Sequence, residues 1–208
     1  MPKIENVEVF GLERAIKTAK YPKAVDINSL NSELTKGIQA CSSCPSGTGH
    51  DNFLKGIIVT FDLTFSEKAW PQIQRYHFID FISSQSTMHR ITKFSVKNQC
   101  NRYVDHRIID ILQEKIDEYN RMSALPILND INSSMERKKI LDDLYLHILY
   151  NIPSGFELTA GMVTNYLQLK TIYKQRRNHR LLDWQIFCDW CETLPRFMEL
   201  TQKEKNNA

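Results

Sequence analysis

The residues best suited to chemistry lie in the segment 165–184, NYLQLKTIYKQRRNHRLLDW. Aromatic and aliphatic residues recur in it at the spacing of one helical face: Tyr166, Leu169 and Tyr173. Arg176 and Arg180 are four residues apart, so we expect them on one face of the same helix. Arginine binds phosphate through paired hydrogen bonds and stacks on rings, which suits a planar anionic ligand such as a nucleotide. The alternative for this segment is a solvated basic face.

Two further stretches carry polar groups suited to ligand binding. Gly49 and His50 end a Gly-rich loop, where glycine lets backbone approach a ligand and histidine can hydrogen-bond a ring nitrogen or a phosphate. The segment 83–90, SSQSTMHR, places hydroxyl groups before His89 and Arg90, which suits phosphate oxygens at a helix start. Each stretch also has a structural alternative, because serines cap helices and a loop histidine can lack any role.

Several well-known motifs are absent from the sequence. It has no GxSxG elbow, Walker A loop, GxGxxG or HExxH motif. His77 stands among aromatic residues in YHFID, a pattern more typical of a core histidine than of a catalyst. The net charge of +3 and the lack of a recognisable module make nucleic acid an unlikely partner.

Length and composition are those of an ordinary globular protein. The 208 residues suffice for one good-sized domain, and 42% hydrophobic with 25% charged residues is typical of such proteins. No run approaches the roughly 18 apolar residues of a membrane helix, and the N-terminus lacks the apolar core of a signal peptide. We therefore expect a cytoplasmic protein without a membrane partner.

The five cysteines include two CxxC pairs, Cys41–Cys44 and Cys188–Cys191. Four thiolates can hold zinc, and a single CxxC pair can act as a redox couple. The second pair, however, lies in an apparent amphipathic helix, where buried thiols behave as small hydrophobic groups. An odd cysteine count without a secretory context argues against a disulfide framework, and we predict no bound metal.

Hydrophobic periodicity predicts both strands and helices. The clearest strand is Ile57–Phe65, whose odd positions are apolar, whereas Ile73–Phe81 fits either a strand or a short helix. Helices are predicted at Val9–Lys20, Asp26–Gln39, Arg107–Met122 and Glu136–Tyr150. The apolar stripes of the last two include Ile108 and Ile140. Helices then dominate to Pro195, with a break at Asn178–Arg180.

These elements predict a single α+β domain over residues 1–208, with a mostly antiparallel sheet packed with helices. Residues 1–48 are expected to form an N-terminal helical segment and a loop, because CSSCPSGTGHD is rich in glycine, proline and serine. The tail 201–208 is expected to fray.

Three blocks, taken in order, resemble the flavin-dependent thymidylate synthases, in particular short phage-encoded relatives. GHDNFLKGIIVTFDL is similar to the family's Gly-His loop and central strand. YHFIDFISSQSTM stands in the place of the family's signature R-H-R-x-x-S-x-N-E-x-S-x-R. NYLQLKTIYKQR resembles a late helix that brings an asparagine to the flavin and an arginine to the nucleotide. The resemblance covers about residues 49–195.

The resemblance implies roles for individual residues. His50 and Asn165 fall on residues that contact the flavin, and Ser86 falls on the signature's nucleotide-binding serine. Arg176 matches the arginine that binds and polarises the uracil nucleotide, which makes it the implied catalytic residue. Gln85 and Arg90 join the nucleotide-binding set. Arg176 follows Asn165 by eleven residues, about three turns, so we expect both along one cleft.

The signature is altered in this chain. In an ungapped reading its R-H-R triplet becomes Tyr76-His77-Phe78, its first serine becomes Phe81, and its last arginine becomes Met88. Its Asn-Glu pair becomes Ser83-Ser84. In the family those charged groups hold the phosphate and the reacting base. His89, Arg90, Arg177 or Arg180 are candidates to replace them.

The resemblance also implies a reaction and an assembly. The family transfers one carbon reductively to C5 of a pyrimidine deoxynucleotide such as dUMP. FAD is the implied cofactor, with reduced nicotinamide and folate as co-substrates. A homotetramer with ligand sites shared between subunits is expected, in the host cytoplasm if the protein is phage-encoded.

Two alternatives remain from the sequence. A non-catalytic nucleotide-binding phage protein on the same scaffold would sequester a host nucleotide or signalling molecule. That alternative fits the altered signature, because a binding protein needs the pocket without the poised charges. The other is a structural or regulatory phage protein with no small ligand.

Overall fold

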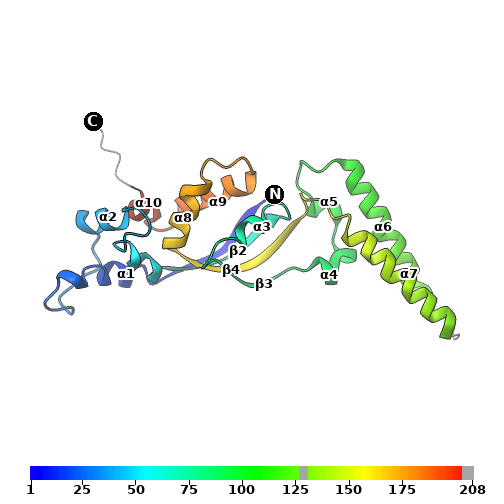
Figure 1. Ribbon diagram of the computed structural model, residues 1–208, viewed down its shortest axis with the longest axis horizontal. Helices are drawn as coiled ribbons and strands as arrows, with labels where there is room; N and C mark the ends of the chain where they lie inside the picture. The colour runs from blue at the N-terminus through cyan, green and yellow to red at the C-terminus, as the bar shows by residue number, and fades with distance from the viewer. Residues whose placement is uncertain (127–130, 203–208) are drawn as a thin grey trace. The chain divides into compact units, whose positions relative to one another are not determined.

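The computed structural model describes residues 1–126 and 131–202. It has the predicted α+β architecture, with a four-stranded antiparallel sheet in the order β1-β2-β4-β3 (Figure 1). The strands are β1 (Lys3–Phe10), β2 (Ile58–Ser66), β3 (Asp80–Ser84) and β4 (Glu157–Asn165).

The chain forms two compact units, which we treat separately. The first contains Met1, Thr64–Trp70 and the described part of Ser84–Thr159. The second contains Pro2–Leu63, Pro71–Ser83 and the chain from Ala160. Strands β2, β3 and β4 each contribute residues to both units. The expectation of a single domain stays a prediction.

The strand expected at Ile57–Phe65 is confirmed as β2, shifted by one residue to Ile58–Ser66. Its alternation has the expected cause, because the apolar residues at odd positions are buried: Ile57, Val59, Phe61, Leu63 and Phe65. Thr60 and Asp62 alternate with them at half-buried positions, as a strand with two unlike faces requires.

Two strands, β1 and β4, were not predicted from the sequence. The helix expected at Val9–Lys20 is wrong in its first part, because Val9 and Phe10 end β1 and the helix α1 covers only Leu12–Thr18. Most β1 side chains are exposed, so the strand shows no apolar period. Strand β4 was expected to be helical, although its buried residues do alternate along ELTAGMVTN. Alanine and glycine are weak strand formers, which masks that period.

The region between α1 and the Gly-rich loop is less helical than predicted. A short 3₁₀ turn, η1 (Tyr21–Lys23), precedes a single helix, α2 (Lys36–Ser42), so the helix expected at Asp26–Gln39 is wrong. Asp26 instead forms a local turn, in which its carboxylate accepts from the Asn28 backbone N–H at 2.8 Å. Thr35 caps α2 by accepting from the Ile38 N–H at 3.4 Å.

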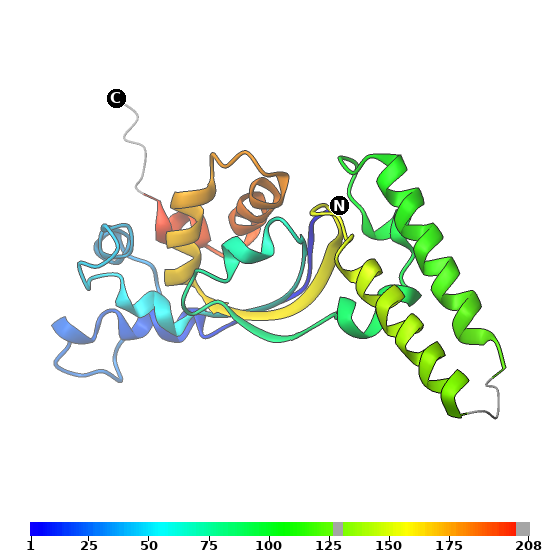
Figure 2. The same ribbon diagram turned by 45° about the vertical axis from the view of Figure 1, so that its right-hand side comes forward.

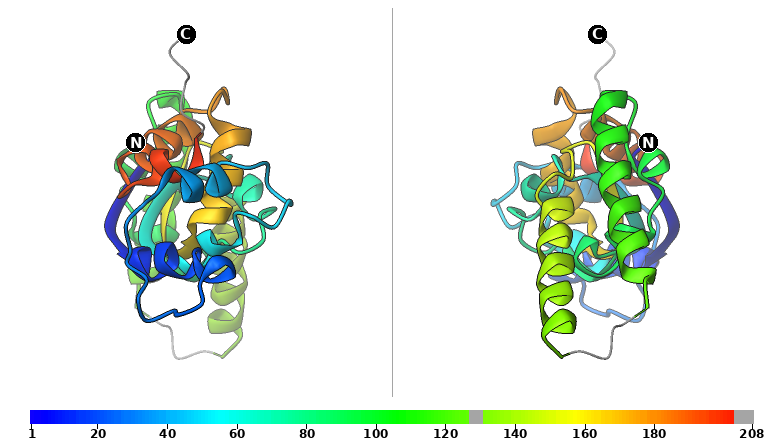
Figure 3. Two further views of the ribbon diagram at one scale, coloured as in Figure 1. Left: turned by 90° about the vertical axis from the view of Figure 1, so that its left-hand side faces the viewer. Right: turned by 90° about the vertical axis from the view of Figure 1, so that its right-hand side faces the viewer.

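The first unit is built around two long helices. The predicted helices are confirmed as α6 (His106–Ala124) and α7 (Ile131–Leu149), which lie side by side in Figures 2 and 3. The buried residues of their stripes pack in one cluster with Phe156: Ile109, Leu112, Ile116 and Ile148. Ile108 and Ile140, expected in the stripes, are exposed instead. Neighbouring short elements are α4 (Thr87–Arg90), η3 (Ile91–Lys93) and α5 (Val96–Gln99).

The second unit ends in three helices, α8 (Tyr166–Arg176), α9 (Leu182–Thr193) and α10 (Phe197–Thr201). The predicted break at Asn178–Arg180 is confirmed, because it falls between α8 and α9. Thr201, expected in a frayed tail, is buried and donates to the Phe197 carbonyl at 2.7 Å. The rest of that expected tail, residues 203–208, lies outside the described residues.

The remaining short elements are α3 (Trp70–Ile73) and the 3₁₀ turn η2 (Asn52–Gly56). The segment Ile73–Phe81 therefore combines the end of a helix with the start of β3. Within the described residues, no helix is long and apolar enough to cross a membrane.

Gly11 is required where β1 turns into α1. Its φ is +78°, and an added Cβ would run into the carbonyl oxygen of Gly56. We predict that Gly11→Ala lowers the free energy of unfolding by about 2 kcal/mol or more, because the left-handed backbone and the close approach both disfavour a side chain. Urea denaturation followed by circular dichroism measures the loss.

Gly37→Ala is the matched control. Gly37 lies in α2, and a Cβ there would meet its nearest atom, Thr35 Oγ1, at 3.9 Å. Alanine is the better helix former, so this change should raise stability by about 0.5–1 kcal/mol. Equal effects of the two substitutions would contradict the steric argument.

Candidate functional site

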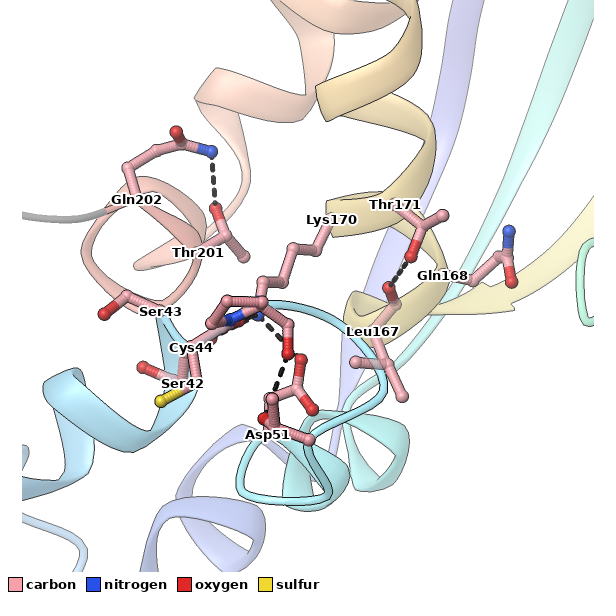
Figure 4. Close-up of polar contacts among 12 residues, drawn as sticks. Ser42, Ser43, Cys44, Asp51, Leu167, Gln168, Lys170, Thr171, Thr201 and Gln202 are labelled. Carbon is pink, nitrogen blue, oxygen red and sulfur yellow. Dashed lines mark hydrogen bonds and ion pairs between the residues drawn. The ribbon is translucent and has the colours of Figure 1, made fainter.

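A buried lysine joins α8 to the Gly-rich loop. Lys170 is only 6% exposed, and its Nζ forms an ion pair with Asp51 Oδ2 at 2.7 Å. The same Nζ donates to the carbonyl oxygens of Ser42 at 2.7 Å and Cys44 at 2.6 Å. Figure 4 shows these three groups around the lysine amine. Because all three ammonium protons have acceptors, the lysine fastens both ends of the loop to the helix.

A cavity of about 490 Å³ lies between this loop and the start of α8. We call it the asparagine cavity. Its lining combines amide groups, a cation and apolar side chains: Asn52, Lys55, Phe78, Asn165, Leu167 and Gln168. Asp51 also lines it, and the exposed His50 is the neighbour of Asp51 in the chain. Of the two predicted flavin residues, Asn165 lines the cavity, whereas His50 is outside its lining and adjoins it only through Asp51.

Asn165 sits at the junction of β4 and α8 rather than within a helix. Its side-chain oxygen accepts from the backbone N–H of Gln168 at 3.0 Å and so caps α8. The cap uses the oxygen and leaves the side-chain amide N–H₂ available for a ligand in the cavity. Arg176 is outside the lining of the asparagine cavity, and the expectation of one cleft running three helical turns from Asn165 to Arg176 stays a prediction.

Arg176, at the other end of α8, is held by neutral groups. Its Nε donates to Tyr76 Oη at 2.7 Å, and its Nη1 donates to Gln72 Oε1 at 3.2 Å. Its guanidinium carbon lies 4.6 Å from the centre of the Trp184 ring. Within residues 1–126 and 131–202, no carboxylate forms an ion pair with it. Neutral groups therefore fix the guanidinium in place.

The charge of Arg176 also acts on a nearby histidine. Burial, followed by the charge of Arg176, lowers the pKa of His179, whereas Asp183 acts in the opposite direction. His179 Nδ1 accepts from the Leu181 backbone N–H at 3.1 Å, which requires that nitrogen to be unprotonated. The histidine thus adds no positive charge beside Arg176 at neutral pH.

Arg177 differs sharply from its neighbour. Its Nη1 pairs with Asp189 at 2.7 Å and its Nε with Glu192 at 3.1 Å, both on α9. The hydrogen bond to Asp189 raises the pKa of Arg177. Arg180, expected on one helical face with Arg176, lies in the turn after α8, so that expectation is wrong.

A second cavity, of about 550 Å³, is lined by the residues that stand in the place of the signature triplet. Tyr76, His77 and Phe78 line it, together with Asp80 and Phe81 at the start of β3. We call it the signature cavity. His77 is exposed, so the expectation of a core histidine is wrong. Tyr76 links the cavity to Arg176 through its hydroxyl.

The other predicted nucleotide contacts belong to the first unit. Gln85 is engaged with Thr159, since its backbone N–H donates to the Thr159 oxygen at 2.9 Å and its Oε1 accepts from the Thr159 N–H at 2.9 Å. Ser86 is half-buried at the start of α4, and Arg90 is exposed at its end. Their roles in nucleotide binding stay predictions.

Two of the five cysteines, Cys188 and Cys191, are buried, and the other three are partly exposed. None of the five forms a disulfide, and burial raises the pKa of Cys188 to about 11 and that of Cys191 well above its usual value. Protonated thiols are poor nucleophiles and poor metal ligands. In the described part of the chain, no group of three or more His, Cys, Asp or Glu residues is placed to hold a metal.

Lys170 and Phe78 are functional candidates that the sequence reasoning missed. A signal existed for Lys170, because it is four residues after Tyr166 and three before Tyr173 and so shares their buried face. A lysine on an apolar face requires a partner, but its partner Asp51 is 119 residues away in the chain. Phe78 gave no such signal.

Two solved structures share this fold over nearly the whole chain. Both are crystal structures of the flavin-dependent thymidylate synthase ThyX from Helicobacter pylori with FAD and dUMP. The first has a TM-score of 0.65 and covers 95% of this chain and 96% of that chain. The second has a TM-score of 0.60 and covers 96% of each. Identity is 11% in both cases, so the likeness concerns the fold.

No protein-family model matches the sequence, and no curated protein matches it.

The lysine tether gives a direct test. We predict that Lys170→Met lowers the free energy of unfolding by about 3–5 kcal/mol, because it leaves the Asp51 carboxylate buried without its countercharge. Chemical denaturation of the purified variant measures the loss. Lys174→Met is the control on the same helix, and the exposure of Lys174 predicts a change within about 0.5 kcal/mol. Equal midpoints for the two variants would show that the tether contributes little.

Proposed function

We propose that this chain is a flavin-dependent enzyme of the thymidylate synthase type. On this proposal it transfers one carbon reductively to C5 of a pyrimidine deoxynucleotide similar to dUMP. The observation that carries the proposal is the fold, shared over 95% of this chain with a ThyX that binds FAD and dUMP. The asparagine cavity and Arg176, whose hydrogen-bond partners are neutral groups, support it.

The residues of the asparagine cavity fit a flavin. Amide groups of Asn165 and Gln168 suit the carbonyl and N–H groups along the polar edge of its ring system. Phe78 and Leu167 supply apolar surface for the ring faces, and Lys55 suits the pyrophosphate. His50 would approach from the adjoining loop. When bound and reduced, FAD supplies the hydride for the family's reaction.

Arg176 is the residue proposed to act on the nucleotide. Its neutral partners orient the guanidinium without cancelling its charge. Such a preorganised charge stabilises negative charge that develops on a pyrimidine during attack at C5. Gln85, Ser86 and Arg90 are proposed as further nucleotide contacts. A homotetramer with shared sites would allow residues of different subunits to meet one nucleotide.

The remaining parts of the proposal follow from the same resemblance. Reduced nicotinamide and folate would be the co-substrates. The protein would act in the cytoplasm, which is the host's cytoplasm if it is phage-encoded.

The signature cavity favours a second candidate function. Tyr76 and Phe78 stand where the family has two arginines, and each lost charge-assisted contact removes about 1.5–3 kcal/mol of binding. A non-catalytic protein that sequesters a nucleotide or signalling molecule needs no such charges. Such a binding protein would retain the ligand-binding cavities but would not catalyse one-carbon transfer.

The absorbance spectrum of the protein as purified tests the cofactor. The proposal predicts flavin bands, with FAD identified by mass spectrometry of the material that heat releases. A colourless protein that takes up no added FAD would refute the enzyme and favour the binding protein. Nucleotide binding without flavin, seen as a rise in melting temperature, would identify the second candidate.

Arg176 gives the sharpest test of the nucleotide site. We predict that Arg176→Ala weakens dUMP binding by about 1.5–3 kcal/mol, roughly ten- to a hundredfold, measured by isothermal titration. Arg177→Ala is the matched control, because Asp189 and Glu192 already engage that charge. Its dissociation constant should stay within about twofold of the wild type. Equal effects of the two substitutions would mean that the basic end of α8 is only a solvated face.

A further inference from the structure

Phe78 has a backbone conformation that its side chain disfavours. Its φ is +64°, in the left-handed region that suits glycine and that bulky residues rarely adopt. Residues held in such conformations concentrate at ligand sites, where surrounding contacts must maintain the strain. The contacts around Phe78 therefore indicate why this strained conformation is maintained.

A partly buried hydrogen bond holds this conformation. The hydroxyl of Thr164 donates to the Phe78 carbonyl oxygen at 2.7 Å, and Thr164 itself is buried near the end of β4. Thr164 immediately precedes Asn165, so successive residues of one strand fix Phe78 and line the asparagine cavity. Ile79, the next residue along from Phe78, is buried and anchors the segment on its other side.

These contacts hold the aromatic ring of Phe78 in a solvent-exposed position. The Phe78 residue is 69% exposed, although both of its anchors, Thr164 and Ile79, are buried. It lines the asparagine cavity and also the signature cavity. A single exposed phenylalanine is common on protein surfaces. Here, however, the fold maintains strain to keep the ring at the border of two cavities.

We propose that Phe78 is the stacking platform for a planar heteroaromatic ring bound in the asparagine cavity. The ring would lie against Phe78 and Leu167, while its polar edge meets the amides of Asn165 and Gln168. This inference rests on the proposed function in that the ring would be that of the flavin. It identifies a binding residue at a position where the resemblance puts an arginine.

The chemistry of recognition changes with that replacement. An arginine attracts phosphate, and its binding weakens as salt rises. A phenylalanine ring instead offers a π face and apolar surface, which are insensitive to salt. The preferred ligand is therefore an uncharged ring system, and phosphates would contribute less to its affinity. Riboflavin, which has the flavin ring without phosphate, is the suitable probe.

The experiment titrates the full-length protein with riboflavin and follows the quenching of flavin fluorescence. Phe78→Gly removes the ring and suits the left-handed backbone, so its melting temperature should equal or exceed that of the wild type. Its affinity for riboflavin should fall at least about tenfold. Phe78→Leu, which stays apolar but loses the aromatic face, should weaken binding in the same direction. Phe78→Tyr should bind nearly as the wild type does.

Two further variants complete the design. Thr164→Val removes the hydroxyl that holds the Phe78 carbonyl, and it should weaken riboflavin binding although the ring is still present. Phe10→Leu is the matched control, because Phe10 is a 50% exposed phenylalanine on β1, outside the residues that line the two cavities. Its affinity should equal that of the wild type.

Two results would overturn the stacking role. One is equal riboflavin affinity in the wild type, Phe78→Gly and Phe78→Leu. The other is a wild-type protein that binds neither riboflavin nor FAD. Failure of the proposed function looks different: riboflavin binding that depends on Phe78, in a protein that does not bind dUMP, would refute the synthase and leave the stacking platform intact.

Discussion

The buried ion pair between Lys170 and Asp51 is the interaction on which the rest of the candidate site depends. Removing both charges from water costs several kcal/mol, and only close geometry with full hydrogen bonding compensates for it. Lys170 meets both conditions, because its Nζ donates to oxygen atoms of Ser42, Cys44 and Asp51 at 2.6–2.7 Å. One wall of the asparagine cavity comes from this loop and the other from α8. The ion pair therefore holds together the two elements between which the cavity lies.

The two adjacent arginines at the end of α8 show how tertiary contacts assign function. Arg176 and Arg177 are alike in sequence, yet one meets a phenol, an amide and an indole ring, and the other meets two carboxylates. A guanidinium paired with acids has little capacity left for an anion. One fixed by neutral groups keeps that capacity. The acids on α9 pair with Arg177, which leaves Arg176 as the better candidate for the proposed nucleotide contact.

The sequence predicted those parts of the fold whose periodicity is local. Strand β2 and the helix α6 each carry an apolar pattern of their own period, so their residues report their structure. Strand β1 does not, because most side chains of this edge strand are exposed; backbone pairing and polar contacts, such as that of Asn6 with Asp62 at 2.6 Å, hold it instead. The site divides in the same way. Asn165 was predicted as a site residue from a block of neighbouring residues, whereas the Lys170 tether joins residues 119 positions apart.

The chain keeps a fold while changing the polar groups that the fold presents. The resemblance puts arginines where Tyr76 and Phe78 stand, and the cavity around them is now lined by rings, a phenol and an imidazole. The phenol still serves a cation, because Tyr76 Oη accepts from Arg176 and leaves that residue's charge intact. The positive charge beside the signature cavity is thus that of Arg176, and the cavity itself offers aromatic rings on which a ligand could stack. If the proposed stacking role holds, ligand recognition here would depend more on ring shape and less on phosphate than in an arginine-rich site.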